Sequence, residues 1–81
     1  MFARVPRSAN PDPALAAVIR RLREDRGLTR EALAFHAGMT TGSLARIELA
    51  QSVPGWDTVR SITEALDVTL SELATAVEAE N

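Results

Sequence analysis

Residues 34 to 48, AFHAGMTTGSLARIE, constrain the fold most strongly, because a glycine separates two short segments with helical apolar spacing. Gly38 tolerates the left-handed backbone that often ends a helix, and Thr40 is a preferred residue for capping the next one. Leu44 and Ile47 then lie on one face of that second helix. Two short helices joined so tightly predict a helix-turn-helix whose second helix is held outward from the protein surface.

The rest of the chain shows helical periodicity with capping signals and no strand pattern. Helices are expected over about residues 13–26, 30–37, 41–49 and 56–66, and a fifth helix is expected in the segment that opens at Thr69. Their inward residues are predicted to be Leu15, Ile19, Leu22, Leu33, Ala34, Ala37, Leu44, Ile47, Val59, Ile62, Leu66, Leu70, Leu73 and Val77. We expect an all-α, compact five-helix bundle over residues 12–78, with a flexible basic arm at 1–11 and a disordered tail at 79–81.

The net charge of −2 argues at first against a nucleic-acid partner, but the charges are unevenly distributed along the 81 residues. Residues 1–46 carry eight arginines and four acids, a balance of 8 − 4 = +4. Residues 47–81 carry one arginine and seven acids, a balance of 1 − 7 = −6. We therefore expect a basic front and an acidic back.

Several functional classes find little support in the sequence. The chain has no cysteine, its apolar runs are too short to cross a bilayer, and its N-terminus lacks a signal-peptide core, so we expect a cytoplasmic protein. His36 is the only histidine and has no fellow ligands or nucleophile to serve; it is expected to be an exposed residue. We expect no cofactor, no metal site, no small-molecule substrate and no enzymatic activity.

Residues 14–75 resemble the Cro/cI-type, XRE-like helix-turn-helix domains of phage repressors and bacterial regulators, whose fold is lambda-repressor-like. The resemblance lies in the order of small, apolar and charged residues rather than in one contiguous motif. Matching positions are Leu22, Arg23, Gly27, Leu28, Leu33, Ala34, Gly38, Leu44, Ile47, Glu48, Pro54, Leu66 and Leu73. It implies a DNA-binding protein whose recognition helix, about residues 41–49, enters the major groove.

The resemblance also implies roles for individual residues. The expected DNA contacts are Arg30, Thr40, Thr41, Gly42, Ser43 and Arg46. Arg30 stands where the family usually has a glutamine near a phosphate, and Arg46 is the only residue of the tip able to make a bidentate guanine contact. Arg23 and Glu48 stand where related repressors have a structural ion pair. The loop after the recognition helix, often basic in the family, carries no charge here.

Apolar residues at unusual positions suggest a contact surface. Leu49, Val53 and Trp56 group near the region where related repressors dimerise, which favours a dimer interface; the alternative is that Trp56 fills the core while the other two are scattered surface residues. Phe35 is unassigned and is a candidate to pack against the arm. Two arginines of the arm have two interpretations, disorder or contact with a minor groove.

The sequence therefore predicts a sequence-specific transcriptional regulator that binds double-stranded DNA as a homodimer on a palindromic operator. The same chain is also compatible with the antitoxin or controller protein of a two-gene module, with a toxin or regulator as its protein partner. A further alternative is a protein-interaction module with the same fold and little DNA affinity.

Overall fold

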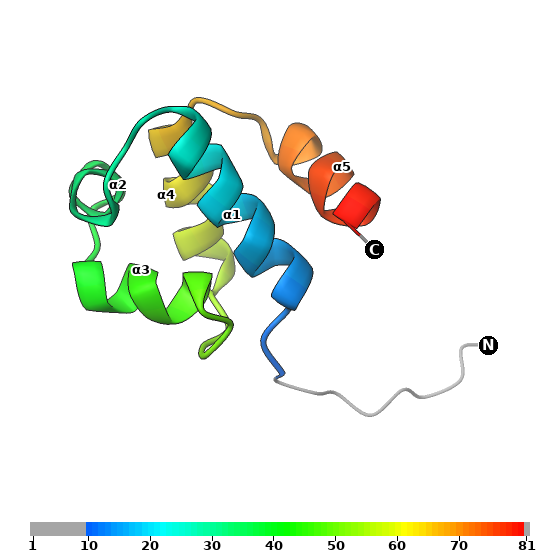
Figure 1. Ribbon diagram of the computed structural model, residues 1–81, viewed down its shortest axis with the longest axis horizontal. Coiled ribbons are helices and arrows are strands. Elements are labelled where there is room, and N and C mark those ends of the chain that lie inside the picture. Colours follow the sequence, from blue (N-terminus) through cyan, green and yellow to red (C-terminus); the bar gives the residue numbers. More distant parts are fainter. Residues whose placement is uncertain (1–9, 81) are drawn as a thin grey trace.

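The computed structural model describes residues 10–80, and within that range the chain forms five α-helices and no strand. The helices are α1 (Pro13–Asp25), α2 (Arg30–Ala37), α3 (Thr41–Glu48), α4 (Trp56–Leu66) and α5 (Leu70–Glu80). In Figure 1, α1 crosses the middle of the bundle, with α2 and α3 on one side and α5 on the other. The predicted all-α five-helix fold is confirmed.

The helices begin where the sequence places caps. The side chains of Asp12, Thr29 and Thr40 accept hydrogen bonds from backbone N–H groups of the first helical turns at 2.9, 3.0 and 3.1 Å. At the start of α5, the hydroxyl of Thr69 accepts from the N–H of Glu72, whose carboxylate accepts from the N–H of Thr69. These local bonds satisfy N–H groups that have no partner inside a helix, so they fix the helix starts.

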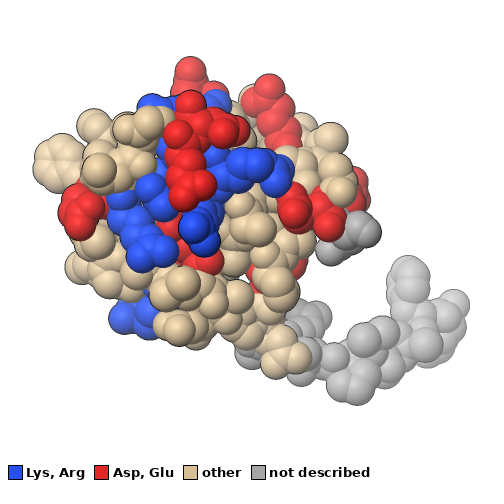
Figure 2. All heavy atoms as spheres, in the orientation of Figure 1, with Lys and Arg blue, Asp and Glu red and all other residues tan. Residues whose placement is uncertain are grey.

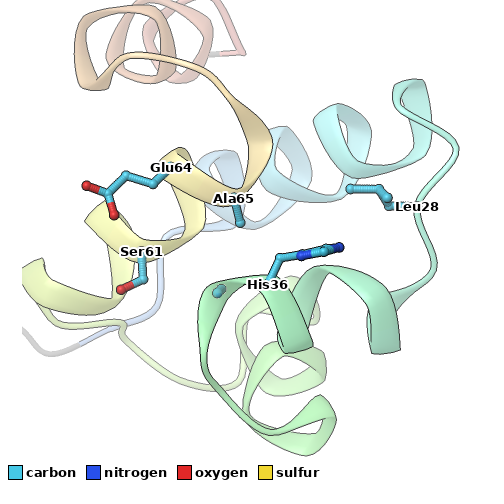
Figure 3. Close-up of a pocket in the computed structure, with 6 residues that line it drawn as sticks. Leu28, His36, Ser61, Glu64 and Ala65 are labelled. Atoms are coloured by element: carbon cyan, nitrogen blue, oxygen red, sulfur yellow. The ribbon is translucent and has the colours of Figure 1, made fainter.

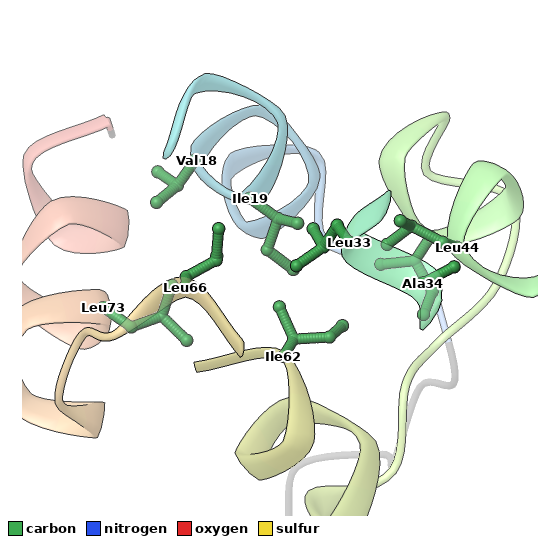
Figure 4. Packing of buried hydrophobic residues seen from close by; sticks show 9 residues of the cluster. Val18, Ile19, Leu33, Ala34, Leu44, Ile62, Leu66 and Leu73 are labelled. Carbon is green, nitrogen blue, oxygen red and sulfur yellow. The ribbon is translucent and has the colours of Figure 1, made fainter. Parts of the chain in front are cut away.

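The core forms where the inner faces of all five helices meet (Figure 4). Ile19 of α1 is fully buried as predicted, whereas Leu15 and Leu22 are half-buried at the edge of the core. Val18 is not among the predicted inward residues, yet it is fully buried, because α1 packs against α3 and also against α5 and therefore buries two faces. The core residues are Val18, Ile19, Leu33, Ala34, Leu44, Ile47, Ile62, Leu66 and Leu73.

Two predicted boundaries differ from the structure. The sequence predicts a tail from residue 79, but α5 continues through Glu80, whose carboxylate accepts a hydrogen bond from Nη1 of Arg21 on α1 at 2.5 Å. This contact ties the last turn of α5 to the bundle. The helix predicted over about residues 41–49 ends at Glu48, one residue early, with Leu49 as its C-cap. Residues 1–9 of the predicted arm lie outside the described residues.

Gly38 makes the tight turn between α2 and α3 possible. Its φ of 71° and ψ of 32° are left-handed, and its N–H bonds back to carbonyl groups of α2. We expect Gly38→Ala to lower the free energy of unfolding by about 1–2 kcal/mol, because a Cβ strains this left-handed backbone even though, among the described residues beyond its two chain neighbours, no atom lies within 4 Å of it.

Gly42→Ala is the matched control in chemical denaturation. Gly42 lies within α3, and an added Cβ there meets only Arg46 Nη1 at 3.9 Å. Alanine is a better helix former than glycine, so this variant should gain about 0.5–1 kcal/mol. Equal midpoints for the two variants would show that the left-handed turn contributes nothing.

Candidate nucleic-acid interface

The helix α3 divides cleanly into an inner and an outer face. Leu44, Ile47 and Glu48 are buried against the bundle, whereas Gly42 and Arg46 are exposed on the opposite side. This follows from the helical period, since residues 44 and 47–48 are one turn apart and residues 42 and 46 are four apart. The structure therefore presents the predicted reading positions outward, with Thr41 and Ser43 half-buried beside them.

Three side chains are linked at the tip of α3. The hydroxyl of Thr40 caps the helix and donates to Oγ of Ser43 at 2.9 Å, and Nη2 of Arg46 donates to the same oxygen at 3.4 Å. The guanidinium of Arg46 thus lies back over the first turn, close to Gly42. The long bond to Ser43 is weak and exposed, so Arg46 can exchange it for a ligand at little cost.

Glu48 accepts hydrogen bonds from two arginines. Arg23 donates through Nε to Oε2 at 2.7 Å and through Nη2 to Oε1 at 3.1 Å, a bidentate pair between α1 and α3. The hydrogen bond with Glu48 raises the pKa of the Arg23 guanidinium further above its ordinary value. The Glu48 side chain is fully buried, and therefore cannot face a phosphate directly.

Arg30 is the second partner of Glu48, a contact that the sequence alone did not predict. Its Nε donates to Oε1 of Glu48 at 2.8 Å, from the first residue of α2. The signal in the sequence was the arginine at a position where the related domains usually have glutamine. The family resemblance predicts that Arg30 lies near a phosphate, and its side chain remains partly exposed beside the buried carboxylate.

The predicted basic front is not a continuous positive surface. Figure 2 shows arginines and acidic side chains interspersed on the face that carries α1. Ion pairs join Arg20 to Glu24 and Arg21 to Glu80, in addition to those with Glu48. Glu48 and Glu80, which belong to the acidic second half of the sequence, therefore pair with arginines of the first half.

Within residues 10–80, only Arg26 and Arg46 among the arginines have no carboxylate within 4.0 Å. Arg26 donates to the carbonyl of Leu22 at the end of α1. Arg46 is the arginine of α3, and its charge is not paired with a carboxylate in the described part of the chain.

His36 borders an open hollow of about 480 Å³ between α2 and α4, together with Ser61 and Glu64 (Figure 3). The ring of His36 points toward Leu28 and away from the other two side chains. No hydrogen bond joins His36, Ser61 and Glu64 in the described region, so the three do not form a catalytic triad there. His36 is exposed, as predicted from the sequence.

Residues 10–80 contain neither a metal-binding cluster nor a membrane span. No group of three or more histidine, cysteine or acidic residues in this range could hold a metal ion. None of the five helices combines the length and apolar character that a membrane span requires.

Four large apolar side chains are exposed in the part of the chain that the structure describes. Trp56 is 64% exposed, which rules out its predicted alternative role of filling the core. Leu49 and Val53, 51% and 53% exposed, line hollows beside α1 and beside α3.

Trp56 instead borders an open groove of about 500 Å³, which we call the α4–α5 groove. Its apolar lining comprises Leu15, Trp56, Val59, Leu70, Leu73, Ala74 and Val77. Phe35, on α2, stacks edge-on with His36.

Comparison with known families identifies the class of protein that this fold and site define. A model described as a helix-turn-helix domain matches residues 14–76. The chain therefore belongs to the helix-turn-helix domain family, and the resemblance drawn from its sequence is confirmed. No curated protein sequence matches the chain significantly.

Solved structures of bacterial regulators are similar to this chain. The restriction-modification controller protein C.AhdI from Aeromonas hydrophila is 28% identical, with a TM-score of 0.73 over 75% of this chain and 92% of that chain. The clp gene regulator ClgR from Corynebacterium glutamicum is 24% identical, with a TM-score of 0.79 over 84% and 88%. The controller protein C.Esp1396I is 20% identical, with a TM-score of 0.80 over 84% and 87%. The chain has the helix-turn-helix fold of DNA-binding transcription regulators.

Proposed function

We propose that this protein is a sequence-specific transcriptional regulator that binds a palindromic operator as a homodimer and acts in the bacterial cytoplasm. The observation that carries the proposal is the outward face of α3, where Gly42 and Arg46 are exposed and Arg46 has no carboxylate partner among residues 10–80. In this proposal α3 lies in the major groove, and Arg46 reads a guanine. Thr40, Thr41 and Ser43 lie along the groove wall, and Arg30 lies near a phosphate.

Two copies are needed because one helix tip with so few reading side chains discriminates poorly. Two half-sites about 34 Å apart double the number of base contacts, as in other helix-turn-helix dimers. We propose that the second copy covers the α4–α5 groove and that Trp56 is its central contact. A large aromatic side chain beside an apolar groove is typical of the residues that dominate interface energies.

Trp56→Ala tests the dimer. We expect self-association to weaken by about 2 kcal/mol or more, while the fold is retained because Trp56 is mostly exposed. Sedimentation of the variant and the parent over a range of concentrations measures the shift. Phe35→Ala is the matched control, since Phe35 is 81% exposed on α2, outside the groove, and its removal should leave the dimer intact.

Trp56 is also the only tryptophan in the chain, so its fluorescence reports the same contact. Dilution of the parent protein should shift the emission to longer wavelength as the indole returns to water. An unchanged spectrum together with a concentration-dependent mass would place the dimer contact elsewhere.

Selection of bound fragments from the source genome tests the proposed function as a whole. The expected result is a set of fragments sharing two inverted half-sites, protected as a pair in footprinting. Fragments without common symmetry would overturn the palindromic operator. No binding even to random DNA at low salt would instead favour the protein-interaction module of the same fold.

Similarity to C.AhdI, at 28% identity over most of that chain, favours one particular setting for the regulator. We propose as a second candidate that the chain is the controller protein or the antitoxin of a two-gene module. Co-purification of the chain with the product of an adjacent gene, or repression of that gene by the purified protein, tests this setting.

A further inference from the structure

The buried carboxylate of Glu48 is shared unequally by its two arginines. The side chain of Glu48 is completely inaccessible, that of Arg23 is 11% exposed and that of Arg30 is 31% exposed. Nη2 of Arg23 also lies 3.9 Å from the exposed carboxylate of Glu24, whereas Arg30 has no carboxylate other than Glu48 within 4.0 Å in the described residues. The charge that Glu48 leaves uncompensated is therefore mainly that of Arg30, which is also the more exposed of the two arginines.

The hydrogen bonds show which nitrogens remain available. Arg23 uses Nε and Nη2 on Glu48 and donates from Nη1 to the carbonyl of Leu28 at 2.8 Å, so all three nitrogens are engaged. Arg30 uses only Nε, on Glu48. Within residues 10–80 its two terminal nitrogens have no partner.

We propose that Glu48 is a positioning residue for DNA binding: it holds Arg30 by Nε so that both terminal nitrogens face outward and bind one backbone phosphate. The inference rests on the proposed function and assigns a task to a carboxylate that cannot itself contact DNA. A guanidinium presents donors along two edges, so one edge can be anchored while the other binds an anion bidentately. Anchoring removes rotamers that a free arginine would lose on binding.

Simple electrostatics predicts that neutralising Glu48 changes the DNA affinity in the opposite direction. A carboxylate near a phosphate-rich ligand repels it, so its neutralisation should strengthen DNA binding. If Glu48 orients Arg30, its neutralisation should weaken binding although the protein becomes more positive. The sign of the change therefore separates the two mechanisms.

The variant Glu48→Gln tests the direction of the change in DNA affinity, with Glu31→Gln as the matched control. Glu31 is an exposed carboxylate in the first turn of α2, so both variants lose one negative charge in the same region. Binding to a selected operator is measured at a temperature where circular dichroism shows each protein folded. We expect about tenfold weaker binding for Glu48→Gln, from loss of an oriented charged hydrogen bond, and equal or stronger binding for Glu31→Gln.

Arg30→Lys is the second variant and does not disturb the pair between Arg23 and Glu48. Lysine keeps the charge but has a single ammonium group, which Glu48 would retain. The dependence of log K on log salt should therefore become shallower by about 0.9 for each phosphate that the variant fails to bind, or about 1.8 for a dimer. Arg20→Lys, in the exposed pair with Glu24, should leave that slope unchanged.

The outcomes distinguish this inference from the proposed function. No DNA binding by the unmodified protein would overturn both. Normal binding by the unmodified protein, with unchanged salt slope in Arg30→Lys, would overturn only the positioning role. Stronger binding by folded Glu48→Gln would do the same, because it would show that the carboxylate acts only by repulsion.

Discussion

Replacing Glu48 with alanine is expected to lower the free energy of unfolding by about 3–5 kcal/mol, the cost of leaving a buried charge without its partner. The side chain of Arg23 is only 11% exposed and cannot turn into water without leaving the interface between α1 and α3. Alanine removes the acceptor of two Arg23 hydrogen bonds and of the Arg30 bond together. For a domain of this size that loss is a large fraction of total stability.

Urea denaturation followed by circular dichroism measures the effect, with Glu64→Ala as the control. Glu64 pairs with Arg60 on the surface of α4, where the two side chains are 73% and 57% exposed, so its removal should cost at most about 1 kcal/mol. If Glu48→Ala costs no more than Glu64→Ala, the buried pair does not join α1 to α3 energetically. An unchanged m-value is also expected if both proteins unfold in two states.

Much of the fold could be predicted because its determinants are local. The capping box of Thr69 and Glu72 and the left-handed turn at Gly38 involve residues four or fewer positions apart, and each appears in the structure. Helix faces follow from the same short-range spacing. The burial of Val18 could not be predicted in this way, because it depends on where α5 packs, more than fifty residues later in the chain.

In the candidate site, too, features that depend on local spacing could be predicted, and features that depend on tertiary contacts could not. The outward position of Arg46 follows from the helical period once Leu44 and Ile47 are recognised as inward. The bond from Arg30 to Glu48 spans eighteen residues and depends on how α2 crosses α3, and the pairing of Arg21 with Glu80 spans fifty-nine. Charge totals along the sequence therefore overestimated the basic face, because tertiary contacts bring acids to it.

Arg46→Ala is expected to weaken binding to the selected operator by about 1–3 kcal/mol per half-site, and so by about 2–6 kcal/mol for a dimer. Arg46 is the only arginine of α3; it is exposed and has no carboxylate partner among the described residues. Gly42, beside it, has no side chain with which to read a base. Removal of Arg46 should therefore relax the preference for one base in each half-site.

Arg26→Ala is the control that separates base reading from loss of charge. Arg26 is the other described arginine without a carboxylate within 4.0 Å, and it lies at the C-cap of α1. Its removal subtracts the same charge and should weaken binding to all sequences equally and modestly. Affinities for operators with each base pair changed in turn measure the difference. If Arg46→Ala keeps the base preferences of the unmodified protein, α3 does not read sequence through this residue, and the helix serves only to bind the DNA backbone.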